Sequence, residues 1–172
     1  SEKGLVLFQK KPFVEHIIQA VLPITDQIKL ITASKEYDYL PYEKMPDLVL
    51  NKGPLGGIYT ALSHSETEFN LILSCDIPLI STELLQELIS KHTEEAGITV
   101  FASESKTHPL IGIYSKKIVP IIKSAIEADE LKMMDLLAKV PHQILNIEES
   151  ENYPLTNINS ADELNDLNIN LI

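Results

Sequence analysis

An acid at the end of an apolar run is the first feature of this sequence that could do chemistry. Residues 71–81 read LILSCDIPLIS, so Asp76 follows a predicted buried strand and Pro78 comes two residues later. The carboxylate could bind Mg²⁺, which usually takes one or two protein carboxylates together with phosphate oxygens of a substrate. It could equally start a turn through a hydrogen bond from its side chain to the backbone. The pattern alone leaves both interpretations open.

A glycine-rich stretch, GPLGGIYTAL, is the second candidate. It contains Gly53, Gly56 and Gly57 just before a predicted helix. Glycines let a backbone approach a ligand closely, and a helix N-terminus attracts anions such as phosphate. Tight packing of the helix is an alternative reason for the same glycines, and taken alone the pattern favours packing.

Polar side chains also occur near the ends of predicted elements further along the chain. His108 lies at the start of the strand HPLIGIY, and Asn157 and Asn159 precede a helix capped by Ser160, with Glu163 in the capping-box position. A single histidine is more often hydrogen-bonded or exposed than a ligand, and asparagines before a helix serve turns and caps. Each of these features is ambiguous by itself.

The elements that must position these residues alternate between strands and helices. Predicted helices cover residues 12–24, 81–92, 117–128, 131–140 and 160–169, and residues 53–64 are expected to be a glycine loop that runs into a helix. Predicted strands cover 27–34, the neighbourhood of Val49, 69–76, 97–103, 108–115 and 142–147. This alternation predicts one α/β domain over residues 1–172, with three α/β/α layers and a mostly parallel, Rossmann-like sheet. A small antiparallel excursion is expected between Gly97 and Tyr114, where a short polar loop joins two strands.

The predicted sheet gives Asp76 a definite place. In an open α/β sheet, ligands bind outside the carboxyl ends of the strands. The LILS stretch is expected to fill the sheet interior, so Asp76 would emerge at that edge. Pro78 would end the ladder there because it has no backbone N–H to donate.

The composition indicates a soluble globular protein and argues against some partners. The 172 residues are 44% hydrophobic and carry a formal net charge of -11, so a nucleic-acid partner is not expected. Cys75 is the only cysteine, no apolar run reaches the length of a membrane span and no signal peptide is visible, so we expect a cytoplasmic protein without a membrane partner. Nothing near Cys75 in the sequence would lower its pKa, so we expect a small buried packing residue rather than a nucleophile.

Four stretches in this order resemble the MobA family: GPLGGIYTAL, LSCDIPLIS, HPLIGIYSKKIVPII and NINSADELNDL. Members of this family are molybdenum cofactor guanylyltransferases with a nucleotide-diphospho-sugar transferase fold. The resemblance implies transfer of GMP from Mg-GTP to molybdopterin, with release of pyrophosphate. It implies GTP and molybdopterin as small-molecule substrates, Mg²⁺ as cofactor, and other molybdenum-cofactor biosynthesis proteins and molybdoenzymes as partners.

The resemblance also assigns roles to individual residues of the nucleotide side. Asp76 matches the metal-binding acid and Lys3 the lysine that contacts the nucleotide, so these two are the expected catalytic residues. Gly53 matches the loop before the helix, and Thr32 lies where some members have an asparagine that contacts the base. Asn51 takes the position of an acid that selects guanine, with Asp47 as the second candidate.

The pterin side is assigned in the same way. Gly57, Asn157 and Asn159 match residues that the family uses there. Lys132 falls where some members have an arginine that faces the pterin phosphate. Lysine keeps the positive charge but lacks the two-pronged geometry of a guanidinium group.

Two departures from the family pattern matter. The family begins with a strand and a loop of the type L-A-G-G-x-S-x-R-M-G, and this chain starts at Ser1, where that loop should end. We therefore expect a first strand and a phosphate-binding loop upstream, or else a truncated variant with an exposed sheet edge. The stretch DLVLNKGPLGG is also short, and a gap after Asn51 is an alternative alignment.

Two other functions stay open at this point. One is a related nucleotidyltransferase that uses CTP or another phosphorylated acceptor. The other is a non-catalytic nucleotide-binding homologue, which the absent loop would favour.

Overall fold

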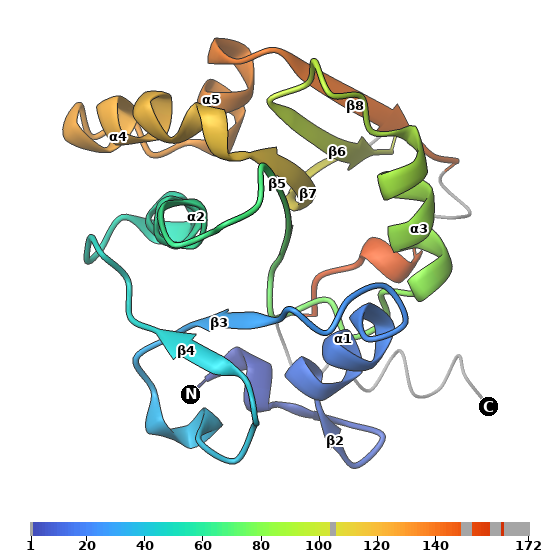
Figure 1. Cartoon of the computed structure of the whole chain (residues 1–172). Coiled ribbons are helices and arrows are strands. Elements are labelled where there is room, and N and C mark those ends of the chain that lie inside the picture. The colour runs from blue at the N-terminus through green and yellow to red at the C-terminus, as the bar shows by residue number, and fades with distance from the viewer. Residues whose placement is uncertain (1, 104–105, 149–152, 159–162, 164–172) are drawn as a thin grey trace.

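A four-stranded mixed sheet is the centre of the fold in the computed structural model, which describes residues 2–103, 106–148, 153–158 and 163 (Figure 1). Its strands lie in the order β5, β7, β6, β8. Their bounds are Phe69–Leu73 for β5, Ile98–Ala102 for β6, Thr107–Ser115 for β7 and His142–Asn146 for β8. β6 and β8 pair in parallel, whereas β7 is antiparallel to both β5 and β6.

Only the direction of β7 is reversed among these four strands. β5, β6 and β8 run the same way, so the prediction of a mostly parallel sheet with one antiparallel excursion is confirmed. The excursion is the β6–β7 pair, which falls between Gly97 and Tyr114 as predicted. The ladder shifts register between Val100 and Phe101, which marks a bulge in β6.

Two further pairs of short strands lie on the other side of β5. β3, Lys29–Ile31, pairs in parallel with β4, Glu43–Met45. β1, Leu7–Phe8, and β2, Lys11–Pro12, form an antiparallel hairpin. The predicted strand near Val49 was wrong, because the chain there forms bends and a turn and the strand lies earlier, in β4.

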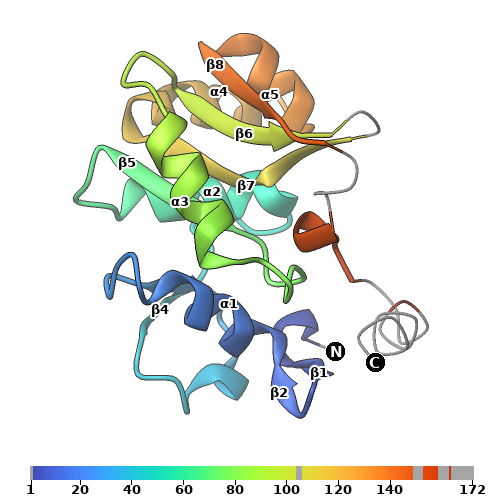
Figure 2. The same cartoon turned by 90° about the vertical axis from the view of Figure 1, so that its right-hand side faces the viewer.

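Helices cover both faces of the four-stranded sheet (Figure 1, Figure 2). They are α1 Phe13–Val21, α2 Gly53–Ser63, α3 Thr82–Lys91, α4 Val119–Glu127 and α5 Met133–Lys139. One apolar cluster joins α2, α4 and α5 to β6 and β7, and a second joins α1 and α3 to the opposite face. In the described part of the chain, short 3-10 turns cover Lys3–Leu5, Lys35–Tyr37, Lys116–Ile118 and Tyr153–Leu155. The three α/β/α layers are thus confirmed.

Local sequence signals explain where two of these helices begin and end. In α1 the predicted apolar face, Val14, Ile17, Ile18 and Val21, is buried, and Pro23 follows the helix end. α3 begins at the predicted cap, where the Leu84 N–H donates to Ser81 Oγ at 3.2 Å. None of the helices within the described ranges has the length and apolar character needed to cross a membrane.

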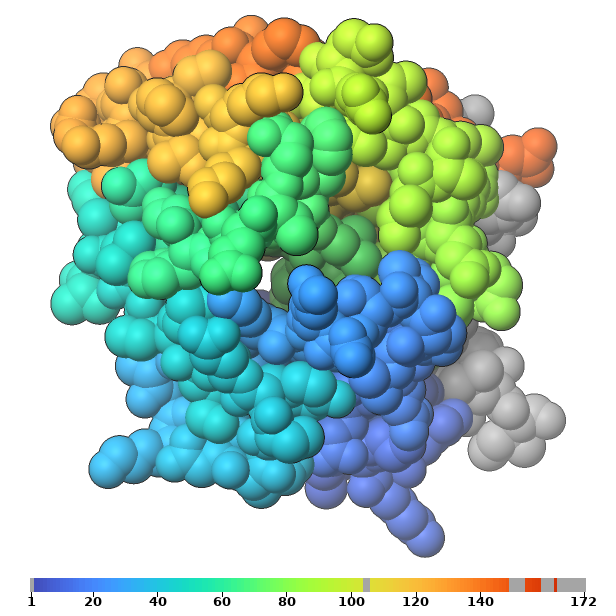
Figure 3. Space-filling model, viewed as in Figure 1, coloured from blue at the N-terminus to red at the C-terminus, as the bar shows by residue number. Residues whose placement is uncertain are grey.

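β5 differs from the prediction of a fully buried strand. All five of its residues are only half-buried, whereas every residue of β6 is buried. One edge of β5 pairs with β7, and its other side borders a cavity of about 560 Å³ between β5 and β3 (Figure 3). The strand lacks a neighbour on that side among the described residues, which explains its exposure.

Glycines at two positions give a stability test of this packing. A Cβ on Gly112, in the middle of β7, would lie 2.7 Å from Val100 Cγ1 and 2.8 Å from the carbonyl oxygen of Thr99. We expect Gly112→Ala to lower the free energy of unfolding by about 1–3 kcal/mol, as overpacking does, in urea denaturation. Gly57→Ala is the matched control, because its Cβ would meet Asp47 Oδ1 at an ordinary 3.7 Å. Inside α2 that alanine should stabilise by about 0.5–1 kcal/mol; equal effects at both sites would contradict the strand packing.

Candidate active site

Asp76 lies just beyond the carboxyl end of β5, as the sequence predicted, and its side chain is held by neighbours. Ser74 Oγ donates a hydrogen bond to Asp76 Oδ1 at 2.8 Å, and Asn157 Nδ2 donates to the same oxygen at 3.2 Å. Only 8% of Asp76 is exposed. Because two donors engage one carboxylate oxygen, the rotamer of this acid is fixed.

The backbone around Asp76 is anchored as well. The N–H of Ile158 donates to the carbonyl oxygen of Asp76 at 2.8 Å, so a segment near the end of the chain closes against β5. Ile77 and Ile80, on the following turn, are buried in the core. The position of this acid therefore depends on contacts made far apart in the sequence.

Lys3 is the cation that faces Asp76. Its Nζ lies 3.5 Å from Asp76 Oδ2, the oxygen that Ser74 and Asn157 leave open. The Lys3 side chain is 55% exposed, so its charge is accessible from solvent. Lys3 and Asp76, the two predicted catalytic residues, are thus brought together.

Tyr37 supports the segment that contains Lys3. Its buried hydroxyl donates to Glu2 Oε2 at 3.2 Å, and a Cβ on Gly4 would lie only 2.7 Å from the hydroxyl oxygen. Burial, followed by the charge of Glu2, raises the pKa of Tyr37, so the phenol stays a neutral donor. Glycine at position 4 lets the chain pass close over this ring.

The oxygen donors at Asp76 fit one type of metal site. Among the described residues, no group of three or more His, Cys, Asp or Glu side chains could hold a metal ion. Mg²⁺ does not require such a group, since one carboxylate with substrate phosphates and waters is a common arrangement. Asp76 has one oxygen fixed by neutral donors and one facing the open side, which fits that arrangement.

Cys75 corrects a prediction. The residue is exposed rather than a buried packing residue. Its sulfur nevertheless lies in partly desolvated surroundings, and this desolvation, then the Asp76 carboxylate, raises the pKa of the thiol. A raised pKa leaves the thiol protonated near neutral pH, which agrees with the expectation that Cys75 is no nucleophile.

Thr32 lies close to this centre, at the carboxyl end of β3. Its N–H donates to the carbonyl oxygen of Met45 at 2.7 Å, and its Oγ1 accepts from the Ser34 N–H at 3.1 Å. It lines a cavity of about 280 Å³ together with Ser74 and Cys75. The predicted base-contacting residue therefore shares a cavity with residues next to Asp76.

The turn before α2 contains the next group of predicted residues. Asn51 and Gly53 adopt left-handed backbone conformations, with φ of 60° and 55°, and both are exposed. The carboxylate of Asp47, the second candidate for the guanine-selecting acid, lies beside Gly57 in the first turns of α2. No hydrogen bond or ion pair links this turn to Asp76 in the described part of the chain.

One pterin-side prediction lies away from the contacts described so far. Lys132 is exposed just before α5 and forms no ion pair with the described residues. Asn159 lies outside the described residues. Asn157, also predicted for the pterin side, contacts Asp76 directly. His108 is buried in β7, opposite Phe101.

Ser74 is a residue of the candidate site that sequence reasoning missed. It is the last residue of the LILS stretch and was read only as the end of a strand. Its position two residues before the acid is the signal that could have found it. A serine two residues before an acid can reach the carboxylate with its hydroxyl once the β-strand pairing has ended.

Comparison with protein families decides the class of this protein. Residues 1–144 match the family described as "MobA-like NTP transferase domain". The chain belongs to this family. It is therefore a nucleotidyltransferase of the MobA type, which confirms the resemblance seen in the sequence.

Named relatives agree with this assignment. A Flavobacterium johnsoniae protein named "Probable molybdenum cofactor guanylyltransferase" is 95% identical over 171 residues, which is 99% of this chain and 90% of the relative. A protein of the same name from Carboxydothermus hydrogenoformans is 32% identical over 149 residues, 87% of this chain and 75% of the relative.

Solved structures show the same fold. A structure titled as molybdopterin-guanine dinucleotide biosynthesis protein A from Archaeoglobus fulgidus superposes with a TM-score of 0.80 at 20% identity, over 96% of this chain and 88% of that one. A CMP:2-keto-3-deoxy-manno-octonic acid synthetase complexed with CTP gives 0.76 at 9% identity, over 98% and 91%. The Rossmann-like nucleotidyltransferase fold is thus confirmed.

Ser74 gives a test of how Asp76 is positioned. We expect Ser74→Ala to lower kcat by about 10-fold or more, because groups that orient a metal-binding or catalytic side chain typically contribute this much. Ser81→Ala is the matched control: it removes the cap of α3 and should cost about 1 kcal/mol of stability without changing kcat. If Ser74→Ala alters only the melting temperature, this serine has a purely structural role.

Proposed function

We propose that this protein transfers GMP from Mg-GTP to molybdopterin, the organic part of the molybdenum cofactor, and releases pyrophosphate. The observation that supports the chemistry is the Lys3–Asp76 pair at the carboxyl edge of the sheet, with Ser74 and Asn157 on the other carboxylate oxygen. The choice of substrates rests on the name of the 95% identical relative.

The reaction needs positioning more than covalent chemistry. A terminal phosphate oxygen of molybdopterin attacks the α-phosphorus of GTP and forms a new P–O bond. The bond from the α-phosphorus to the bridging oxygen breaks, and pyrophosphate leaves with that electron pair. The protein holds the two reactants in line and neutralises their charge, and both effects lower the barrier.

Asp76 and Lys3 would act together on the triphosphate. Asp76 would hold Mg²⁺, with Ser74 and Asn157 keeping its carboxylate in one rotamer. When bound, Mg²⁺ supplies a Lewis acid that stabilises charge on phosphate oxygens. Lys3 is a half-exposed point charge near the same place and would neutralise the nucleotide phosphates.

The remaining predicted residues would select the substrates. Thr32 and either Asn51 or Asp47 would contact the base, and Gly53 would let the backbone approach the nucleotide. The pterin would meet the residues predicted for that side: Gly57, Lys132, Asn157 and Asn159. Asn157 would then connect the two substrates, since it also contacts the metal-binding acid.

The composition supports a cellular location and a class of partner for this enzyme. A net charge of -11 and a single cysteine fit a cytoplasmic enzyme of small-molecule substrates without a nucleic-acid or membrane partner. Proteins that make or receive the molybdenum cofactor would be its protein partners.

Replacing the metal-binding acid is the direct test. In the native full-length protein we expect Asp76→Asn to lower the rate of GMP transfer to molybdopterin by at least about 100-fold, with the fold intact by circular dichroism. Asp129→Asn is the control, because Asp129 is an exposed partner of Lys52 and should not affect transfer. Strong residual turnover in Asp76→Asn would contradict the metal role.

The same protein should be titrated with each of the four NTPs and Mg²⁺, with thermal stabilisation as the measurement. GTP should stabilise most. A preference for CTP would favour a cytidylyltransferase, and no stabilisation by any NTP would favour a non-catalytic homologue.

A further inference from the structure

Lys3 has a second acid beside it in the sequence. Glu2 carries the same negative charge as Asp76 and directly precedes Lys3. Among the described residues, the Lys3 ammonium nevertheless pairs with Asp76, 3.5 Å away, and not with Glu2. Opposite charges on neighbouring residues attract each other. A contact that keeps the Glu2 carboxylate away from the ammonium therefore decides where the charge of Lys3 acts.

Tyr37 makes that contact. Its hydroxyl donates a hydrogen bond to Glu2 Oε2 at 3.2 Å, and the residue is only 5% exposed. The ring packs in an apolar cluster with Val14 and Ile18 of α1 and with Leu40. Because these neighbours fix the ring, its hydroxyl holds the Glu2 carboxylate in one place.

The short turn that contains Lys3 depends on this support. Lys3–Leu5 is a single 3-10 turn, and the side chain of Glu2 does not cap it. Such a turn has hydrogen bonds of poorer geometry than those of an α-helix and is not stable by itself. Leu5 packs against the apolar cluster that holds Tyr37. The residues on both sides of Lys3 are thus tied to Tyr37 or to its cluster.

Gly4 connects this support to the segment of Asp76. A Cβ on Gly4 would lie 2.7 Å from the hydroxyl oxygen of Tyr37 and 3.3 Å from Cys75 Cβ. The backbone at Gly4 is therefore wedged between Tyr37 and the residue that precedes Asp76. This packing fixes the separation between the turn of Lys3 and the acid that Lys3 faces.

We propose that Tyr37 is a positioning residue for GMP transfer, because its hydroxyl holds the Glu2 carboxylate away from Lys3. The Lys3 ammonium is then left for Asp76 and for the nucleotide phosphates. Without the hydroxyl, the released carboxylate would compete for Lys3 and bring a negative charge toward the triphosphate. Tyr37 has this role only if the proposed function is correct, whereas the competition between the two acids can be measured without any substrate.

Zero-length cross-linking with a carbodiimide tests that competition, because the reagent joins an amine to a carboxylate that it contacts. The native full-length protein would be treated without substrates, and the cross-links located by mass spectrometry. We expect Tyr37→Phe to lower the yield of the Lys3–Asp76 cross-link at least about threefold. Adding Glu2→Gln should restore the yield, since no second acid then competes for Lys3.

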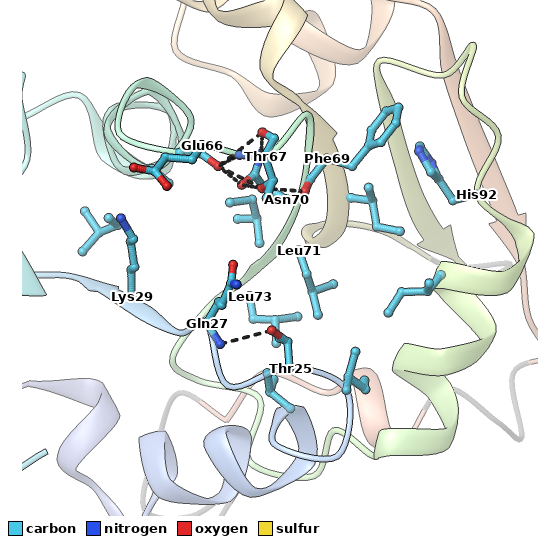
Figure 4. A pocket seen from close by; sticks show the side chains of 18 of the residues that line it. Thr25, Gln27, Lys29, Glu66, Thr67, Phe69, Asn70, Leu71, Leu73 and His92 are labelled. Carbon is cyan, nitrogen blue, oxygen red and sulfur yellow. Dashed lines mark hydrogen bonds between the residues drawn. The ribbon is translucent and has the colours of Figure 1, made fainter. Parts of the chain in front are cut away.

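Lys29 provides the internal reference for this measurement. Its Nζ lies 3.1 Å from Glu43 Oε2, and its side chain borders the cavity between β3 and β5 (Figure 4). This ion pair has no part in the contacts of Tyr37, so the yield of the Lys29–Glu43 cross-link should be the same in all variants.

The same variants would be compared in GMP transfer. We expect Tyr37→Phe to lower kcat/KM for GTP about tenfold and to leave KM for molybdopterin within about twofold, because Lys3 acts on the nucleotide. Adding Glu2→Gln should recover at least about threefold of that loss. Glu2→Gln alone should resemble the wild-type protein, because its carboxamide oxygen still accepts from Tyr37. A hydroxyl with a purely structural role would give no such recovery.

Tyr114→Phe is the matched control. Tyr114 is fully buried in β7, and its hydroxyl donates to the carbonyl oxygen of Pro109. Removing this hydroxyl should lower the melting temperature by about as much as Tyr37→Phe does. The Lys3–Asp76 cross-link and the kinetics should not change.

Three results would overturn the proposal. The first is a Lys3–Asp76 cross-link in Tyr37→Phe that matches the wild-type yield. The second is a loss of kcat/KM that Glu2→Gln does not relieve, which would mean that the hydroxyl only stabilises the fold. The third is a wild-type protein that forms the cross-link but transfers no GMP. That last result would contradict the proposed function itself, and with it the role of Tyr37 in transfer.

Discussion

The functional account of this protein depends on the fixed position of one carboxylate. Asp76 is reached by three segments that are distant in sequence: β5 leads into it, Lys3 faces it, and residues 157–158 close over it. The hydroxyl of Ser74 and the amide of Asn157 share one carboxylate oxygen and leave the other toward Lys3. An acid held in this way presents one oxygen in a constant direction, which is the requirement for binding a metal ion or aligning a triphosphate.

The strands near this acid belong to separate sheets. β5 lies in the four-stranded sheet, and β3 pairs only with β4 among the described residues. Apolar clusters on both faces of the four-stranded sheet bury β6 completely, but β5 stays half-exposed because its outer edge borders the cavity of about 560 Å³ between β5 and β3. Asp76 therefore follows the one strand of this sheet that lacks a neighbour on the side of β3.

Much of the fold could be predicted from the sequence because its signals are local. The apolar face of α1, the Ser81 cap of α3 and the hairpin of β6 and β7 depend on the periodicity and caps of nearby residues. The β1–β2 hairpin was missed because Gln9 and Lys10 take left-handed conformations that such side chains rarely adopt. β4 was missed because its three residues, Glu43–Met45, give no alternating pattern.

The site was predictable in part for the same reason. Asp76 stood out because a strand and a proline flank it, and Lys3 was found through the family resemblance. The closure of Asn157 onto Asp76 could not be read from spacing, since it joins residues 81 positions apart. The exposure of Cys75 was also unpredictable, because it follows from the open edge of β5 rather than from its own neighbours in sequence.

A double-mutant cycle on the Lys3–Asp76 pair tests the central claim most directly. Lys3→Gln, Asp76→Asn and the double variant would be compared in kcat/KM for GMP transfer. If the two side chains act as one charge unit around the triphosphate, the double variant should lose no more than about threefold beyond the worse single variant. If the two losses simply multiply, Lys3 and Asp76 act independently and the account of this site is contradicted.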